Sequence, residues 1–224
     1  MNRFQAAAIM LAAALFASCS GQPDRLIVNQ DEATSDAESA MIFTIVDYKN
    51  KALGASIPEW VNLWLEGGVH EVEAMNAHKD RYVFISRNEG GSINALNYWK
   101  DGFTPQQDFP RMAAARVEAR FSHNVPLPDK EYGAYYETLV RALSDTPWTG
   151  ALREDDFWML KRFPPAEDGS ESETWEFLIL LTIGKSQFTS QLNAIFDKIE
   201  VEPPPSKDQN AAINRAKASL FDGF

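Results

Sequence analysis

The stretch WEFLILLTI, residues 175–183, most constrains what this chain can fold into. Successive side chains of a β-strand point to opposite faces of a sheet, and here both alternating sets are largely apolar. This pattern predicts a central strand in a sheet that is covered on both faces. The rest of the chain must therefore supply neighbouring strands and the helices that cover them.

Other segments of the sequence meet that requirement. Alternating or β-branched runs predict further strands at residues 41–48, 80–91 and 149–163. Apolar residues at spacings of three and four predict helices at residues 56–67, 93–102, 106–123, 129–145 and 186–199. We expect an α+β fold, with a single domain over residues 41–200 built as a mainly antiparallel sheet that carries packed helices. The helices at 106–123 and 129–145 follow each other directly, so we expect them to cover one face together.

The composition is sufficient for one hydrophobic core. Hydrophobic residues make up 45% of the chain and aromatic residues 12%, and the length suggests one domain. The chain contains a single cysteine, Cys19, so it cannot form an intramolecular disulfide. Its stability must come from packing.

The first eighteen residues, MNRFQAAAIMLAAALFAS, have the three parts of an export signal. Arg3 provides a basic start, an apolar run of eleven residues extends from Ala6 to Phe16, and small residues precede Cys19. A helix needs roughly 20 residues to cross the hydrocarbon core of a bilayer. Residues 1–18 are therefore predicted to be a signal peptide that is removed.

Phe16, Ala17, Ser18 and Cys19 resemble the lipobox of bacterial lipoproteins. The resemblance implies cleavage before Cys19, a thioether-linked diacylglycerol and usually a third, amide-linked acyl chain. Two or three chains hold a protein on a bilayer almost permanently, because each buried CH₂ contributes about 0.8 kcal/mol. Ser20 stands where an Asp would signal inner-membrane retention in many such proteins, so we expect the outer membrane, facing the periplasm. The alternative is an ordinary secretory signal with an accidental cysteine.

The residues after Cys19 are polar and acidic. Residues 19–40 are predicted to form a lipidated N-terminus with a disordered tether of roughly 25 Å, and residues 201–224 a Pro-rich break and C-terminal tail. Loss of Arg3 with the signal peptide changes the formal net charge from −11 to −12. Such a charge argues against nucleic acid and against polybasic lipid binding. Membrane attachment is left to the acyl chains on Cys19.

The order of several segments resembles the twenty-kilodalton bacterial lipoprotein family. The resemblance covers about residues 56–184 and is carried by IPEWV, YVFISRNEGG, MAAARVEARF, GALREDDFWML and WEFLILLTI. It implies helices packed on an antiparallel sheet, and a place among outer-membrane lipoproteins, some of them associated with the flagellum. Insertions at residues 68–80 and 92–108 depart from the shorter family pattern.

The titratable residues suggest little chemistry. His70 begins HEVE, but Ala74 stands where the second histidine of a zinc-binding H-E-x-x-H would be. We expect His70, His78 and His123 to face solvent and to bind no metal. In REDDF, residues 153–157, the adjacent Asp155 and Asp156 are expected on opposite faces of a strand, as solvated charge and not as a calcium or general-acid pair. RNEGG, residues 87–91, predicts a turn more strongly than an anion site.

The six tryptophans are the remaining candidates for a site. Trp60 and Trp64 are one helical turn apart and share a face, so they could line a groove for a glycan or peptide. The competing interpretation places them in the core, where aromatic residues at this spacing are more common.

We therefore expect a non-catalytic, lipid-anchored protein of the bacterial cell envelope, with a structural role or an unknown envelope protein as its partner. No catalytic residue and no cofactor is expected, because no nucleophile stands in a recognisable motif. The alternative is a periplasmic-side binding module for a small molecule, peptide or glycan.

Overall fold

The central strand of the sheet is β4 (Ser172–Gly184), which contains the doubly apolar stretch. In the computed structural model, which describes residues 43–124, 130–165, 170–199 and short pieces between 206 and 218, four antiparallel strands lie in the order β1-β3-β4-β2. β4 pairs on one side with β3 (Leu152–Phe163) and on the other with β2 (Arg81–Gly90). The short β1 (Thr44–Tyr48) forms the far edge beside β3. Both faces of β4 are buried, which confirms the prediction from its sequence.

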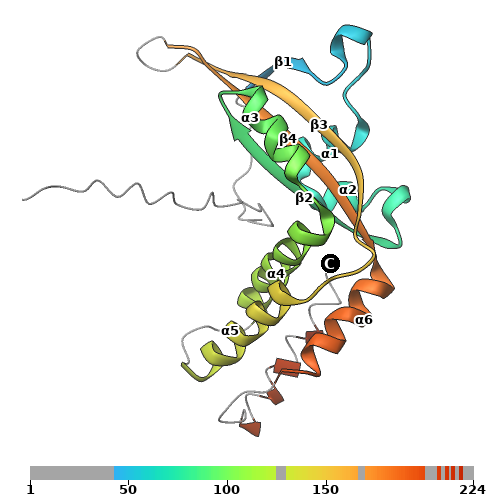
Figure 1. The fold of residues 1–224 in the computed structure, drawn as a ribbon, viewed down its shortest axis with the longest axis vertical. Coiled ribbons are helices and arrows are strands. Elements are labelled where there is room, and N and C mark those ends of the chain that lie inside the picture. The colour runs from blue at the N-terminus through green and yellow to red at the C-terminus, as the bar shows by residue number, and fades with distance from the viewer. Residues whose placement is uncertain are drawn as a thin grey trace, which may run out of the picture.

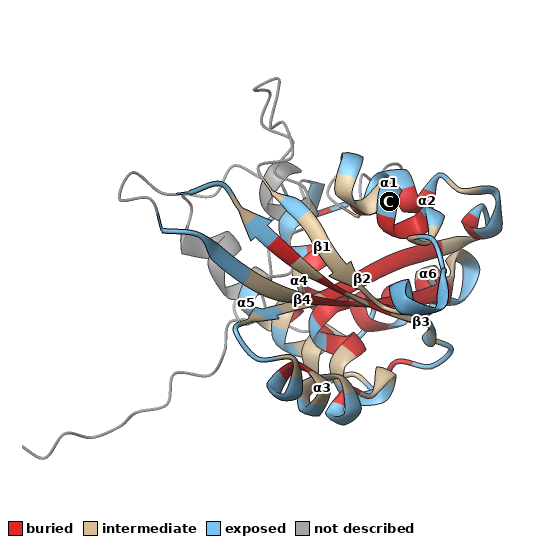
Figure 2. Ribbon diagram, turned by 90° about the horizontal axis from the view of Figure 1, so that it is seen from above, coloured by how far each residue is buried: buried red, intermediate tan, exposed pale blue. Residues whose placement is uncertain are grey.

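Helices cover both faces of this sheet, so the α+β fold with helices packed on an antiparallel sheet is confirmed (Figure 1). Within the described residues, the helices are α1 (Glu59–Gly67), α2 (Val69–Glu73), α3 (Ile93–Gly102), α4 (Pro105–Asn124), α5 (Lys130–Asp145) and α6 (Lys185–Phe196), with 3-10 turns at Lys51–Leu53 and Asn76–His78. Figure 2 shows α3 on one side of the sheet and α1 and α2 on the other. We call the side of α3 to α6 the first face and the side of α1 and α2 the second face.

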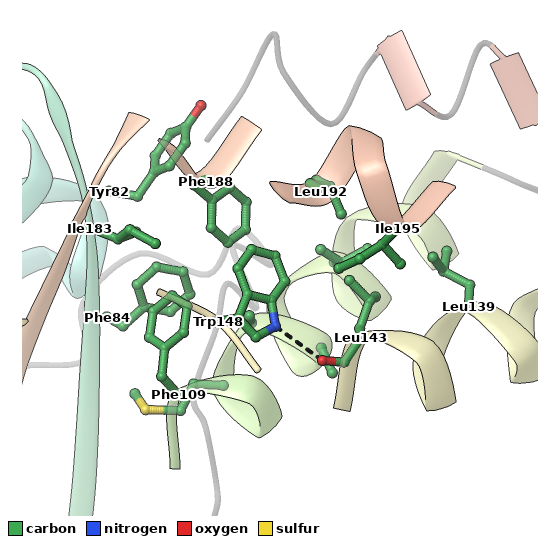
Figure 3. Close-up of a cluster of buried hydrophobic side chains, with 14 of the residues drawn as sticks. Tyr82, Phe84, Phe109, Leu139, Leu143, Trp148, Ile183, Phe188, Leu192 and Ile195 are labelled. Carbon is green, nitrogen blue, oxygen red and sulfur yellow. Dashed lines mark hydrogen bonds between the residues drawn. The ribbon is translucent and has the colours of Figure 1, made fainter. Parts of the chain in front are cut away.

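The first face carries a core of aromatic rings (Figure 3). The rings of Trp148 and Phe188 stack with centroids 4.9 Å apart, and Phe84 meets Phe109 edge to face at 4.8 Å. The indole nitrogen of Trp148 donates a hydrogen bond of 3.0 Å to the carbonyl of Leu143, so its one polar group is satisfied in the apolar interior. α4 and α5 form a helical hairpin on this side, as their succession in the sequence predicts.

The second face has a smaller apolar core, made by side chains of α1 and α2 and by the alternate residues of β2, β3 and β4. α1 follows Pro58 and ends at Gly68, whose φ of +75° is a conformation that favours glycine. The chain thereby turns directly into α2. The sequence does not predict α2, because its five residues are too few to establish a helical period.

Candidate functional site: the outer edge of the sheet

The predicted lipid anchor lies outside the described residues. The signal peptide, Cys19, Ser20 and the tether are all in that part of the chain, so their assignment stays a prediction. Among the helices that the structure describes, none combines the length and the apolar character needed to span a bilayer.

The two tryptophans predicted as ligand-facing lie on α1, against the second face. Trp60 is buried, and its indole nitrogen donates a hydrogen bond of 3.0 Å to the carboxylate of Asp155. Trp64 is partly buried and packs against the same core. Both rings therefore contribute to the packing of α1 on the sheet. Trp148 belongs to the opposite core, while Trp158 and Trp175 form a half-buried edge-to-face pair at 5.3 Å.

The prediction that Asp155 and Asp156 lie on opposite faces of a strand is confirmed, because they pair with the successive residues Leu180 and Ile179 of β4, which belong to the second-face and first-face cores. Both carboxylates are nevertheless only partly exposed, and the ammonium of Lys49 lies 3.8 Å from that of Asp155 and 2.8 Å from that of Asp156. Burial alone would raise the pKa of Asp156, but hydrogen bonds from Lys49 and Arg153 outweigh it and the net pKa is lowered. Lys49 and the two carboxylates therefore lie together beside β3, directly after the last residue of β1.

The expectation that the histidines face solvent holds for His70 and is wrong for His78. His78, in the turn at Asn76–His78, is only 8% exposed, and its Nδ1 has no hydrogen-bond partner among the residues that the structure describes. Burial lowers the pKa of His78. His123 lies in α4, where its side chain is not described. No group of three or more His, Cys, Asp or Glu side chains in the described segments is placed to hold a metal.

Four charged side chains, which we call the ion quartet, lie on the second face beyond the apolar core. Lys161 and Glu176 are 7% and 3% exposed, and the lysine ammonium lies 3.0 Å from the glutamate carboxylate. Arg87 contacts Glu176 at 3.4 Å and Glu89 at 3.0 Å, and Lys161 also reaches Glu89. Burial raises the pKa of Glu176, although the two cations oppose this. Two positive and two negative groups thus balance locally.

The outer edge of β2 is sealed at one point by a buried ion pair. One oxygen of Glu73 accepts hydrogen bonds of 3.0 Å from the backbone nitrogen of Val83 and from the guanidinium of Arg116, which in turn donates to the carbonyl of Val83 at 2.7 Å. The two side chains thereby replace the hydrogen bonds that a neighbouring strand would make. The guanidinium also lies over the rings of Tyr82 and Phe84.

The remainder of that edge is open. The N–H and C=O of one residue in an antiparallel strand point the same way, and the direction alternates along the strand. Because Val83 bonds away from β4, the peptide groups of Ile85, Arg87 and Glu89 also point away from it. In the part of the chain that the structure describes, these outward groups have no hydrogen-bond partner. We call residues 85–89 the open segment.

The opposite edge of the sheet, formed by β1, has features that prevent pairing with another strand. β1 has five residues and a bulge between Ile45 and Asp47. The ammonium of Lys51 donates to the carbonyl of Val46, so a cation occupies this edge. Short length, a bulge and an edge lysine are devices that prevent strand pairing. The open segment of β2 has none of them.

Two concave surfaces among the described residues are further candidates. A groove of about 520 Å³ lies between α5 and α6, with Ala142, Ala194 and Ile195 in its wall and Asp145 and Lys198 among its charged residues. A second hollow of about 470 Å³ lies along α1 and the segment from Glu71 to Ala77. Searches of protein-family models, curated proteins and solved structures find no match for this chain.

Proposed function

We propose that this protein is a lipid-anchored, non-catalytic component of the bacterial cell envelope that acts by binding another protein through the edge of its sheet. The observation that carries the proposal is the open segment of β2. An unpaired strand edge is a template on which an extended chain can add by backbone hydrogen bonds. Among the residues that the structure describes, this edge is bonded at Val83 and has no hydrogen-bond partner at the outward groups of residues 85–89.

The proposed location rests on the sequence before the domain. Phe16, Ala17, Ser18 and Cys19 supply a lipobox, and acyl chains on Cys19 would hold the acidic domain close to the periplasmic side of the outer membrane. Membership of the twenty-kilodalton lipoprotein family is part of the same proposal. Replacement of Cys19 by alanine should release the protein from the membrane fraction, and intact-mass analysis of the parent should find the acyl groups. Membrane association that survives this replacement, together with a bare thiol in the parent, would refute the anchor.

The protein contact is tested by site-specific photocrosslinking in the native envelope. A photoreactive benzoylphenylalanine at Asn88, within the open segment, should capture a defined protein neighbour. The same residue at Asn62, an exposed position on α1, is the matched control and should capture much less. Equal capture at both positions, or none at Asn88, would overturn the proposal.

A second candidate function is a binding module for a small apolar molecule, and the groove between α5 and α6 favours it. Its volume of about 520 Å³ falls within the range of ligand pockets, about 300–1,000 Å³. A fluorescent apolar dye should bind the parent and be lost when Ala142→Trp fills the groove, while Ala52→Trp, on an exposed turn, retains it. Dye binding that is unchanged by Ala142→Trp would exclude this groove as the site.

A further inference from the structure

We infer that the partner of the open segment is a second copy of this chain, which pairs β2 with β2 in antiparallel fashion across a two-fold axis at Asn88. This inference rests on the proposed function and names its partner. Two four-stranded sheets would then join into one continuous antiparallel sheet of eight strands, since β2 is the edge strand of each.

Charge selects the register. In this pairing Arg87 lies directly opposite Glu89 of the second copy, and Glu89 opposite its Arg87, so the two-fold axis makes two opposite-charge pairs. Opposite charges across an antiparallel pair are favourable, whereas like charges directly opposite are unfavourable. The side chains stay on the second face, beside Lys161 and Glu176, and the two neutral ion quartets become neighbours.

The neighbouring registers are disfavoured by the same residues. An axis at Arg87 would place this arginine opposite its own copy, and an axis at Glu89 would do the same with the glutamate. An axis at Ser86 would bring Glu89 of the second copy opposite Val83, whose backbone groups already bond Glu73 and Arg116. The seal at Val83 therefore also limits how far a second strand can slide along β2.

The backbone geometry of the proposed pair is complementary. Arg87 and Glu89 present outward N–H and C=O groups, so each Arg87–Glu89 pair forms two backbone hydrogen bonds and the interface has four. Asn88 faces its own copy in a non-hydrogen-bonded position, where Cα atoms are about 4.5 Å apart. That separation lies within the range of about 4.4–6.8 Å that a disulfide bridges.

A cysteine at the axis tests the inference directly. Full-length, membrane-anchored Asn88→Cys, co-expressed with two different tags and oxidised in its envelope, should give a disulfide-linked dimer that carries both tags. The parent, whose single cysteine is Cys19, and Asn62→Cys should give no disulfide-linked dimer under the same conditions. If Asn88→Cys gives no more disulfide-linked dimer than Asn62→Cys, the pairing is wrong.

Proline separates backbone pairing from side-chain effects. The N–H of Glu89 points away from β4, so Glu89→Pro removes an interface donor and leaves the ladder to β4 intact. Glu89→Ala removes the same carboxylate but keeps the N–H. Both changes are combined with Asn88→Cys: we expect loss of the dimer with proline and at least partial retention with alanine. Equal yields of disulfide-linked dimer with Glu89→Pro and with Glu89→Ala would overturn the strand pairing.

The outcome also separates this inference from the proposed function. If the photoreactive residue at Asn88 captures a different protein and Asn88→Cys gives no dimer, the second copy is refuted while the interaction function stands. If neither reagent yields a product, both are refuted. A mixed-tag dimer that Glu89→Pro abolishes supports both.

Discussion

The two faces of the sheet bury their residues by different means. The first face is filled by aromatic and aliphatic side chains from α4, α5 and α6, and its rings contact one another at centroid distances near 5 Å. The second face has a smaller apolar core under α1 and α2, and beyond it the ion quartet. The first face is held mainly by apolar packing, whereas the second includes a cluster of four paired charges.

The two faces also differ in the titratable groups that they bury. Two tyrosines are buried in the first-face core: burial raises the pKa of Tyr82, and that of Tyr135 to about 12. These hydroxyls stay neutral throughout the ordinary pH range. The second face contains His78 and Glu176, whose charges respond to milder pH. It is also the face on which Arg87 and Glu89 would meet a second copy.

Removal of a ring from the first face should produce the largest effect on stability. Phe188 is fully buried and contacts Tyr82, Phe84 and Trp148. Phe188→Ala should lower the free energy of unfolding by about 4 kcal/mol, because it removes the ring and leaves a cavity. Urea denaturation of the purified protein measures this loss. Leu53→Ala is the control, since Leu53 is exposed and its removal should cost less than about 0.5 kcal/mol.

Breaking the ion quartet should be the next largest effect. Lys161→Met leaves the carboxylate of Glu176 buried without its closest cation, and should cost about 3 kcal/mol. The double variant Lys161→Met with Glu176→Leu should recover most of that loss, because a buried ion pair is often replaceable by apolar residues. The exposed pair of Arg162 and Glu173 on the same two strands gives the comparison. Arg162→Met should cost much less than Lys161→Met, because solvent screens an exposed ion pair.

Failure of the double variant to recover stability would sharpen the contrast between the faces. It would mean that the second face needs these charges and not only the volume of their side chains. Equal losses for Lys161→Met and Arg162→Met would instead remove the contrast.

The first face could be predicted well from the sequence because its signals are local. The doubly apolar stretch around Leu180 predicts a central strand, and the apolar periodicity of residues 106–145 predicts two covering helices. Both results follow from the order of residues within one element. The ring contacts between Phe109, Trp148 and Phe188 depend on how distant elements pack, and no local pattern contains them.

The second face was harder to predict because its features join distant residues. Glu176 alternates with Leu178 and Leu180, so the sequence did place a carboxylate in a buried register. Its partner Lys161 is found only once the register across the β3–β4 hairpin is known. The contact of Lys49 with both Asp155 and Asp156 and the strand order that leaves β2 at an edge are likewise tertiary results. The candidate interface was therefore not predictable from the sequence alone.

The raised pKa of Glu176 predicts a pH-dependent difference between parent and variant. The folded state binds this proton more tightly than the unfolded state, so the carboxyl group reduces stability as pH rises from near the ordinary glutamate pKa of 4.5 through its higher folded pKa. Glu176→Gln cannot titrate. Its stability relative to the parent should therefore rise across that window, as measured by urea denaturation at successive pH values.

Glu173→Gln is the matched control for this experiment because it removes an exposed carboxylate from the same strand. Its stability difference from the parent should change little over the same window. A flat difference for Glu176→Gln would show that Lys161 and Arg87 cancel the effect of burial, and the second face would then resemble the first in its response to pH.

His78 should give the smallest effect, with the opposite sign. Burial lowers the pKa of His78, and Arg81 acts in the same direction while the facing carboxylates of Glu154 and Glu73 oppose it. The folded state then binds a proton less tightly than the unfolded state, so stability falls as pH drops from 6.5 towards the lower folded pKa. Thermal unfolding of His78→Gln should show a weaker loss over this window than the parent, and His70→Gln, at an exposed position, should follow the parent. If His78→Gln also follows the parent, the two carboxylates offset burial completely, and acid sensitivity of the second face is confined to groups other than this histidine.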